Sequence, residues 1–494
     1  MDDVRKTLRD RHICVVIPTY NNGGTIARVV ADTQQYCNDV IVVDDGSTDT
    51  TSKELASISG ITVVHYAKNR GKGYALKQGF RKALSLGFSY AITLDGDGQH
   101  YPCHIVDFLH ANQAHPGALI IGNRNLSEVE RSKGSSFANK FSNFWFFVQT
   151  GKRLSDTQSG YRLYPLKKLH GLSLLTNKYE AELELLVFPS WHGVELVSIP
   201  IEVYYPPQEE RVSHFRPGKD FTRISVLNTV LCVLALVYGL PLRLFRFLAK
   251  WGRTIYAMLV FVILMLFIIT PYVWVITKVG KMTEKKRKKL HGIIYNIARF
   301  FMLHHGIPGT HFTNHVAEDV NFEQPHVIIC NHQSHLDLLC QLIFTPNIIF
   351  LTNDWVWKNP FYGLLIRNAE YYPVADGIDS LLPKLRSLTE RGYSIALYPE
   401  GTRSKDCRIG RFHKGAFYIA EQLGLDILPM CLYGTGRVLR KGTHHLNKGP
   451  IHIEVDSPIL RDTLQKQGDL KQQASWMRKK YRTWFEKMSN RFEC

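Results

Sequence analysis

Two groups of polar residues in this sequence have the composition of catalytic sites. The first is Asp-Gly-Asp-Gly-Gln at positions 95–99. Two carboxylates that lie two residues apart, with an amide nearby, can converge on one hard divalent cation. Such a cation stabilises the charge that a diphosphate gains when its bond to a sugar breaks. Two acidic residues at this spacing are also common in surface turns. Whether they form a metal site therefore depends on the strands and motifs around them.

The second group contains His332 and Asp337, within Asn-His-Gln-Ser-His-Leu-Asp at 331–337. A histidine with a near-neutral pKa suits a base that deprotonates a hydroxyl. Where a strand leads through a turn into a helix, this spacing brings the carboxylate to the imidazole, as in a triad without the serine. His335 is an alternative base. Because His and Asp both favour turns, this spacing is also weak evidence alone.

Short apolar runs precede both groups. In the first half they alternate with helical patterns, which predicts an α/β domain with a parallel sheet. The expected strands there are 13–19, 40–43, 61–64 and 90–94, with a helix at about 71–86. A second such pattern begins near 290, with strands expected at 326–330, 347–351, 394–398 and 427–432. Ligands bind beyond the carboxyl ends of such strands, where the polar groups fall.

Two apolar stretches, 225–242 and 255–277, separate the two patterns, and the second is long enough to cross a bilayer. Basic residues follow both stretches: Arg243, Arg246, Lys250 and Arg253 after the first, and Lys278, Lys281 and 285–289 after the second. Positive charge is retained on the cytoplasmic side. We therefore expect a hairpin or interfacial pair of helices in one leaflet, with a buried soluble core as the alternative.

The fold class predicted is α/β, with two α/β domains joined by this apolar, membrane-associated helical segment. The expected parts are a nucleotide-sugar domain at 1–220, a helical hairpin at 221–289, a second enzyme domain at 290–460 and a basic C-terminal helix at 461–494. That last helix packs on the protein or faces a membrane.

The net charge of +18 is unevenly distributed. Residues 1–220 carry a net +2 and residues 221–494 a net +16. The basic clusters adjoin apolar runs, which favours anionic lipid as the partner, and no nucleic-acid-binding motif is present. The nine cysteines form no C-x-x-C pair. We expect reduced thiols, no signal peptide and a location at the cytoplasmic face of the inner (cell) membrane.

The strand-end motifs of the first half occur in a specific order. They are Pro-Thr-Tyr-Asn at 18–21, Asp-Asp-Gly-Ser at 44–47, Asn-Arg-Gly-Lys-Gly at 69–73 and the pentapeptide at 95–99. This set, over residues 12 to about 216, resembles family 2 glycosyltransferases with the GT-A fold. It is most similar to polyprenyl-phosphate sugar synthases such as dolichol-phosphate mannose synthase.

The resemblance implies roles for individual residues. The residues implied to line the nucleoside pocket are Pro18, Tyr20, Asp44 and Asp45. The implied phosphate contacts are Arg124, Arg131 and Arg211, with His214 as a further candidate. Asp95, Asp97 and Gln99 would hold Mg²⁺ or Mn²⁺, with Asp97 essential for catalysis. Residues 159–162 resemble the acceptor-side segment. A hydroxyl acceptor would need a base, for which Glu182 and Glu184 are candidates; surface helix charges are the alternative.

The second half also has an ordered set of motifs. After the His332 group come Tyr-Pro-Glu-Gly-Thr-Arg-Ser at 398–404, Phe-His-Lys-Gly at 412–415 and Ile-Leu-Pro-Met at 427–430. The set resembles glycerolipid acyltransferases of the 1-acylglycerol-3-phosphate type. The resemblance implies that His332 and Asp337 are catalytic without a cofactor and that acyl-CoA or acyl-carrier protein is the donor. The acceptor would be bound by Glu400, Gly401, Thr402, Arg403 and Lys414.

One position departs from that family. Asp376 stands after a strand where a cation is expected. A glycerol phosphate acceptor is therefore less favoured than a less anionic one, such as a sugar hydroxyl.

Together the motifs predict a bifunctional, membrane-associated enzyme of bacterial glycolipid synthesis. One domain would transfer a sugar from a nucleotide-sugar to a lipid, polyprenyl or polyene acceptor, as in aryl-polyene-type lipids, and the other would add an acyl chain to a hydroxyl. The alternatives are two activities on unrelated substrates, namely a polyprenyl-phosphate sugar synthase and a lysophospholipid acyltransferase, or a scaffold that no longer turns over.

Overall fold

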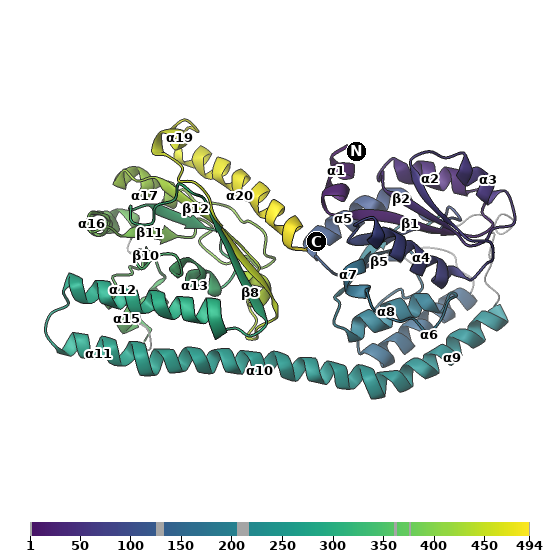
Figure 1. Cartoon of the computed structure of the whole chain (residues 1–494), viewed down its shortest axis with the longest axis horizontal. Coiled ribbons are helices and arrows are strands. Elements are labelled where there is room, and N and C mark those ends of the chain that lie inside the picture. Colours follow the sequence, from purple (N-terminus) through teal and green to yellow (C-terminus); the bar gives the residue numbers. More distant parts are fainter. Residues whose placement is uncertain (1, 125–132, 205–216, 360–362, 375–376, 494) are drawn as a thin grey trace. The chain divides into compact units, whose positions relative to one another are not determined.

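A computed structural model describes residues 2–124, 133–204, 217–359, 363–374 and 377–493. The chain forms two compact units, and the boundary between them lies at Arg246 and Phe247 (Figure 1). Each unit is built around one β-sheet with helices packed against it. The prediction of two α/β domains is therefore confirmed. Arg131, Arg211, His214 and Asp376 lie outside the described residues.

Unit 1 contains a seven-stranded sheet in the order β3-β2-β1-β4-β6-β5-β7. The strands are β1 Ile13–Thr19, β2 Val40–Asp44, β3 Ile61–His65, β4 Tyr90–Thr93, β5 Leu119–Arg124, β6 Arg162–Pro165 and β7 Leu196–Ile201. Strands β3, β2, β1 and β4 are parallel, whereas β6 runs antiparallel to both β4 and β5. The four expected strands all form, within one residue of their predicted bounds.

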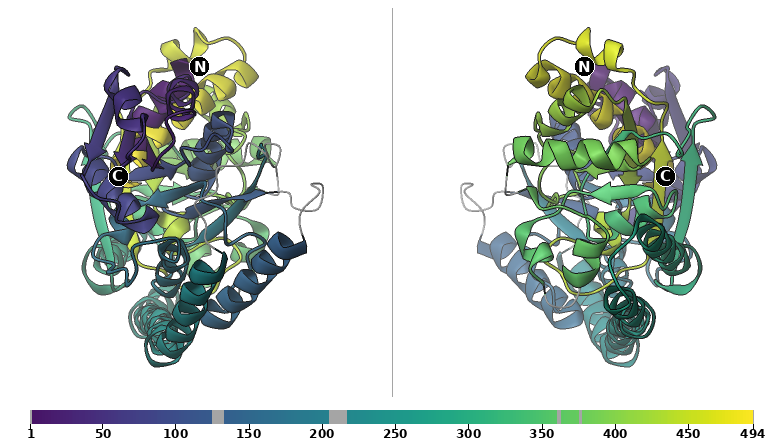
Figure 2. Two further views of the ribbon diagram at one scale, coloured as in Figure 1. Left: turned by 90° about the vertical axis from the view of Figure 1, so that its right-hand side faces the viewer. Right: turned by 90° about the vertical axis from the view of Figure 1, so that its left-hand side faces the viewer.

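Helices cover both faces of this sheet (Figures 1 and 2). They are α1 Asp2–Asp10, α2 Ile26–Gln34, α3 Thr51–Ala56, α4 Lys72–Ser85, α5 Ile105–Ala114, α6 Lys133–Thr150, α7 Leu166–Leu169 and α8 Ala181–Trp191. Alternate residues of β1 enter different cores: Val16 packs with residues of α4, α6 and α8, and Val15 with residues of α2 and α5. A parallel strand covered on both faces is apolar throughout, which explains its unbroken hydrophobic run.

Unit 2 has a six-stranded sheet in the order β10-β11-β9-β12-β13-β8. The strands are β8 Thr310–Val316, β9 Val327–Cys330, β10 Ile348–Phe350, β11 Ser394–Leu397, β12 Ile427–Tyr433 and β13 Gly449–Val455. Strands β10, β11, β9 and β12 are parallel, and β13 is antiparallel to β12. The four expected strands are again present, whereas β8 and β13 were not predicted.

The helices of unit 2 include its C-terminal one. They are α12 Glu284–Arg299, α13 Leu336–Leu342, α14 Asp354–Trp357, α15 Gly363–Asn368, α16 Ile378–Glu390, α17 Gly415–Leu423, α18 Thr435–Val438, α19 Arg461–Gln465 and α20 Leu470–Glu493, with a π-helical end of α12 at Phe300–His305. Ala474, Met477 and Tyr481 of α20 are buried in the core of unit 2. Of the two alternatives for the C-terminal helix, packing on the protein is therefore the one observed.

The predicted hairpin at 221–289 is wrong. The chain stays helical through α9 Pro217–Leu234, α10 Leu240–Leu264 and α11 Thr270–Lys278, with π-helical turns at Ala235–Gly239 and Met265–Ile269 between them. The basic residues between the apolar stretches are good helix formers and contain no turn sequence. Pro241 and Pro271 each follow a π-helical turn, which accommodates a residue that lacks an amide hydrogen.

This long helix is the single stretch, within the part of the chain that the structure describes, long and apolar enough to cross a membrane. Its second half nevertheless packs along unit 2. Ala257, Ile269, Val273 and Ile276 are buried in the same core as α12. Residues between them, such as Phe267, are exposed. One face of the helix thus covers the protein, and the other presents apolar side chains.

We predict that Tyr481→Phe destabilises unit 2. The Tyr481 hydroxyl lies 2.9 Å from the carbonyl oxygen of Ile329 and 3.0 Å from that of Met430, in a fully buried position. Loss of the hydroxyl leaves these carbonyls without that donor, at an expected cost of about 1 to 3 kcal/mol. Urea unfolding of the full chain measures this cost. The exposed Tyr256 supplies the control Tyr256→Phe, and equal free energies of unfolding for the two variants would contradict the assignment.

Candidate active sites

The polar residues that follow β1, β2 and β4 meet at one edge of the unit 1 sheet, because these strands are adjacent and parallel. Pro18 is buried near the end of β1 and Tyr20 follows it, half-buried. Asp44 ends β2, and Asp95 comes two residues after β4. The structure thus places Pro18, Tyr20, Asp44 and Asp95 at the same edge of the sheet.

The two acids after β2 have different roles. Asp45 accepts hydrogen bonds from the amides of Arg70 (2.8 Å) and Gly71 (2.7 Å), so it holds the loop that leads into α4. Burial raises the pKa of Asp45. Asp44 accepts hydrogen bonds from the Ser47 amide at 3.0 Å and from the Ser52 hydroxyl. Although burial opposes it, these bonds lower the pKa of Asp44. Asp44 therefore supports the loop from within, and its expected role in binding the nucleotide stays a prediction.

Asp95 belongs to a compact cluster of buried charges. The Lys72 ammonium lies 2.7 Å from Asp95 Oδ1 and 3.0 Å from Glu182 Oε1. Burial opposes the ionised form of Asp95, but the positive charge of Lys72 prevails and lowers the pKa of Asp95. Glu182 comes from the first turn of α8. Of the two candidate bases in α8, Glu182 is thus the one that joins this cluster, through its ion pair with Lys72.

Glu184, the other candidate base, does not face the site. It is fully buried and accepts hydrogen bonds from the amides of Leu175 (2.5 Å) and Thr176 (2.9 Å). It is neither a base nor a surface charge, since its carboxylate holds the loop before α8. Glu182 lies two residues earlier in the helix and therefore on the opposite face, so periodicity predicts that only one of the two acids faces the site but not which one.

The residues present fit a hard divalent cation. Burial and the charge of Asp95 raise the pKa of Asp97 to about 6, and no described residue forms a salt bridge with Asp97. A Cβ on Gly160 would lie 2.8 Å from Asp95 Oδ2, so only glycine leaves this space open. No three His, Cys, Asp or Glu side chains of the described chain converge on one point. Diphosphate oxygens and water would complete the coordination shell, as is usual for Mg²⁺.

Arg124, an expected phosphate contact, is already engaged. Its guanidinium forms two hydrogen bonds with the buried Asp156 carboxylate, at 2.6 and 2.8 Å. These bonds lower the pKa of Asp156, against the effect of its burial. Asp156 lies just before the acceptor-side segment 159–162. Arg124 therefore holds Asp156 beside that segment, and its expected role as a phosphate contact stays a prediction.

Two residues at this site were missed in the sequence. Lys72 lies in the 69–73 motif but received no role. His100 follows Gln99 directly, and its Nδ1 is 3.9 Å from Asp95 Oδ2. Burial lowers the pKa of His100 to about 4, so the ring is neutral. A polar residue directly after a metal-binding motif was the available signal for His100.

In unit 2, His332 and Asp337 lie beyond β9, as their spacing requires. Nδ1 of His332 is 2.9 Å from Asp337 Oδ2. The same oxygen accepts hydrogen bonds from the amides of Gln333 (2.7 Å) and Ser334 (2.8 Å), at the start of α13. Asp337 is fully buried, whereas His332 is partly exposed. With Nδ1–H donated to the carboxylate, Nε2 carries the lone pair that can accept a proton.

The face of the His332 ring is also supported. The Tyr398 ring stacks on it, with centroids 3.9 Å apart and an angle of 11° between the planes. The Tyr398 hydroxyl accepts a hydrogen bond from Gln341 at 2.9 Å. Gln341 is one helical turn after Asp337 on α13. One helix therefore positions both the edge and the face of the imidazole.

Glu400 forms two hydrogen bonds with backbone amides near the base, and its expected role in binding the acceptor stays a prediction. Its Oε1 accepts a hydrogen bond from the His332 amide and its Oε2 one from the Gly410 amide, both at 3.0 Å. The side chain is buried, and this burial raises the pKa of Glu400 to about 7. Glu400 thus holds the backbone of His332 and the 400–410 loop together.

The other residues of this motif lie on the exposed side of the same loop. Gly401 has a left-handed φ of 67°, which explains the glycine there. Thr402 and Lys414 are exposed, and Arg403 is half-exposed. Lys441 was not predicted, yet its ammonium lies 3.1 Å from Thr402 Oγ1 and 2.6 Å from the Arg403 carbonyl. The Ser404 amide donates a hydrogen bond to the His332 carbonyl at 2.8 Å. This bond connects the loop that carries Arg403 to the backbone of His332.

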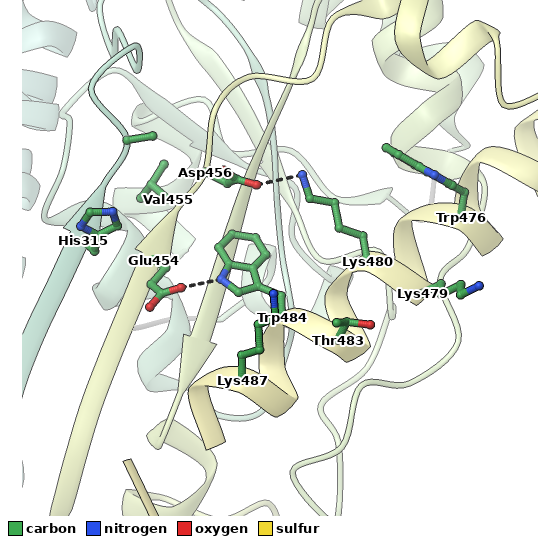
Figure 3. A pocket seen from close by; sticks show the side chains of 11 residues that line it. His315, Glu454, Val455, Asp456, Trp476, Lys479, Lys480, Thr483, Trp484 and Lys487 are labelled. Atoms are coloured by element: carbon green, nitrogen blue, oxygen red, sulfur yellow. Dashed lines mark hydrogen bonds and ion pairs between the residues drawn. The ribbon is translucent and has the colours of Figure 1, made fainter. Parts of the chain in front are cut away.

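A separate cleft of about 710 Å³ lies between α20 and strands β8 and β13 (Figure 3). Its lining includes Trp476 and Trp484, together with acids and lysines that partly pair with one another. Lys480 lies 2.8 Å from Asp456, and the Trp484 indole donates to Glu454. None of its lining residues belongs to either candidate site.

Two family models match the chain, one in each unit. The description of the first is Glycosyl transferase family 2, and it matches residues 14–167. The second is Acyltransferase, and it matches residues 311–433. The matched segments contain the acidic pentapeptide and the His332, Asp337 and Glu400 motifs respectively.

Proteins similar to the first unit come from archaea. An uncharacterized protein of Methanocaldococcus jannaschii is 32% identical over 202 residues, which are 39% of this chain and 82% of that protein. The UDP-N-acetylglucosamine–dolichyl-phosphate N-acetylglucosaminyltransferase of Methanococcus voltae is 28% identical over 221 residues, which are 40% of this chain and 88% of that enzyme.

The second unit is similar to plant enzymes. The chloroplastic 1-acyl-sn-glycerol-3-phosphate acyltransferase of Brassica napus is 33% identical over 143 residues, which are 28% of this chain and 41% of that enzyme. The chain thus spans less than half the length of this relative. The chain thus combines one segment that matches the family 2 glycosyltransferases with a second segment that matches the acyltransferases.

Proposed function

We propose that this protein adds a sugar and an acyl chain in the synthesis of one glycolipid at a membrane surface, as in bacterial glycolipids of the aryl-polyene type. The observation that carries the proposal is that two transferase sites occur on one chain and share an exposed apolar helix. Fusion raises the effective concentration of an amphiphilic intermediate at the second site. The sugar nucleotide and acyl thioester are both cytosolic substrates, so we place the protein at the cytoplasmic face of the inner membrane.

Sugar transfer would occur at the strand ends of unit 1. An acceptor oxygen forms a bond to the anomeric carbon while the bond from that carbon to the nucleoside diphosphate breaks. Asp95, Asp97 and Gln99 would hold Mg²⁺ or Mn²⁺, which supplies positive charge to the departing diphosphate. Asp45 positions the loop that closes the nucleotide side. Glu182 is placed to accept a proton if the acceptor is a hydroxyl, whereas a phosphate acceptor needs no base.

Acyl transfer would occur at His332. Nε2 removes the proton of the acceptor hydroxyl while its oxygen attacks the thioester carbonyl. Asp337 stabilises the imidazolium that forms, and Tyr398 keeps the ring in place. When the carbon–sulfur bond breaks, the proton passes from Nε2 to the leaving thiolate. The cations Arg403, Lys414 and Lys441, which are half-exposed or exposed, suit the anionic part of an acyl donor or an acceptor.

The long helix supports an in-plane membrane association. Four of its residues between 257 and 276 are buried against unit 2, while the residues between them expose apolar side chains. A helix that crosses the bilayer cannot also lie along a polar α/β unit over this length. Basic residues at both ends of the segment suit an anionic headgroup layer.

We predict that the two activities separate by mutation. Asp97→Ala should lower sugar transfer on the order of 10²-fold without changing acyl transfer, since it removes a metal ligand. His332→Ala should lower acyl transfer by roughly 10²- to 10⁴-fold without changing sugar transfer. Radiolabelled sugar and acyl donors measure both in membranes that contain the full chain. EDTA should reproduce only the first effect.

The matched controls are the exposed Asp10→Ala in unit 1 and His444→Ala in unit 2. A shared product further requires that cells with His332→Ala accumulate a glycosylated lipid that lacks the acyl chain. If none accumulates, the rival holds: a polyprenyl-phosphate sugar synthase and a lysophospholipid acyltransferase that act on unrelated substrates. The names of the two similar enzymes above are the observation that favours this rival.

Glu400→Gln gives a prediction specific to its position. Its amide group must face an N–H donor where the carboxylate accepted one, so the His332 backbone shifts. We expect kcat for acyl transfer to fall roughly tenfold while KM for the acceptor changes little. Steady-state kinetics of Glu400→Gln and of the control Glu390→Gln, at an exposed position, measure kcat and KM for this comparison. A rise in KM alone would support the acceptor-binding role that the sequence suggested.

Glu400 also predicts a pH dependence of stability. Because burial raises the pKa of Glu400 from 4.5 to about 7, the folded state binds this proton more tightly than the unfolded chain. Its contribution is complete below pH 4.5 and is lost as the pH rises through about 7. The Tm of the wild type minus that of Glu400→Gln should therefore fall between pH 5 and 8. Thermal unfolding would show a constant difference if Glu400 did not titrate.

A further inference from the structure

The Lys72 ammonium occupies a position suited to a metal ion. It lies between Asp95 Oδ1 and Glu182 Oε1, at 2.7 and 3.0 Å, and its side chain is only 18% exposed. Each of these acids comes from a different part of unit 1, after β4 and in α8, while Lys72 begins α4. The cluster is therefore a product of the fold rather than of a local turn.

Space around the ammonium is limited. A Cβ on Gly160 would lie 2.9 Å from Lys72 Nζ, 2.8 Å from Asp95 Oδ2 and 3.2 Å from Glu182 Oε1. The backbone of Gly160 therefore closes one side of the cluster. An ammonium and a divalent cation on the same carboxylate would repel each other strongly in such a buried place.

The negative charge available without a nucleotide is small. Asp95, Asp97 and Glu182 carry at most three negative charges, and Lys72 already offsets one of them. A divalent ion would add two positive charges beside the ammonium. A bound diphosphate would bring further negative charge and further oxygen ligands, and both favour the ion.

We propose that Lys72 competes with the divalent metal for Asp95, so that the metal binds firmly only together with the diphosphate of the donor. This inference rests on the proposed metal-dependent sugar transfer. Lys72 is a positioning residue in this scheme: it keeps the two acids in place before the donor arrives. The donor and metal then enter as one complex, and the site does not hold metal between turnovers.

The test is Mn²⁺ binding by the full chain, followed by electron paramagnetic resonance of the free ion. Without a nucleotide, Lys72→Met should bind Mn²⁺ at least about tenfold more tightly than the wild type, because one nearby positive charge is removed. Lys53→Met removes a charge from an exposed position of α3 and is the matched control. Adding Asp97→Ala to Lys72→Met should abolish the gain, which would place the ion at this site.

Lys72→Gln keeps a hydrogen-bond donor for the two acids and replaces Lys72→Met in the test if that variant does not fold. We expect it to bind Mn²⁺ more tightly than the wild type by the same factor. Addition of UDP or GDP should tighten Mn²⁺ binding more in the wild type than in either variant. Unchanged or weaker Mn²⁺ binding by the Lys72 variants overturns the competition. Failure of the wild type to bind Mn²⁺ even with either nucleotide, together with sugar transfer that resists EDTA, instead overturns the proposed metal dependence.

Discussion

Burial of carboxylates at the carboxyl ends of parallel strands is the constraint on which both sites depend. A carboxylate that leaves water needs hydrogen bonds or a positive partner, or it takes up a proton. Asp45, Asp337 and Glu400 satisfy this need with two backbone amides each, and Asp337 adds the His332 ring. In doing so they fix the loops that carry the reacting groups.

The two units meet this constraint in different ways, and the difference matches their chemistry. In unit 2, two backbone amides hold the Asp337 carboxylate against the His332 ring, so the base stays in one orientation while a proton moves on and off it. In unit 1, Asp95 and Glu182 share the ammonium of Lys72, and Asp97 keeps a raised pKa of about 6. That arrangement suits a site whose charge changes when a diphosphate and a metal arrive.

The parallel strands could be predicted because each is a short apolar run followed by polar residues, and β1, β2, β9 and β12 formed within two residues of the expected bounds. Among the strands that were missed, β8 and β13 have exposed or mixed faces and lack this pattern, whereas β5 and β6 are largely buried but short. The pairing of His332 with Asp337 followed from local spacing. The roles of Glu400, Arg124 and Lys72 depend on partners 10 to 110 residues away, which spacing does not reveal.

The hairpin was the clearest error, and its cause is instructive. Apolar stretches with basic residues between them suggested a turn, yet Arg243, Arg246, Lys250 and Arg253 all continue the helix. In the continuous helix, these four cations lie between two apolar segments, whereas a hairpin would place them in the turn at its tip. Arg253 donates a hydrogen bond to the Leu446 carbonyl, and the Thr254 hydroxyl accepts one from the Leu446 amide. Unit 2 therefore holds the helix directly at these two residues. Since unit 2 fixes one face of this region, the proposed membrane association would use the opposite, apolar face of the helix, with the helix axis in the plane of the bilayer.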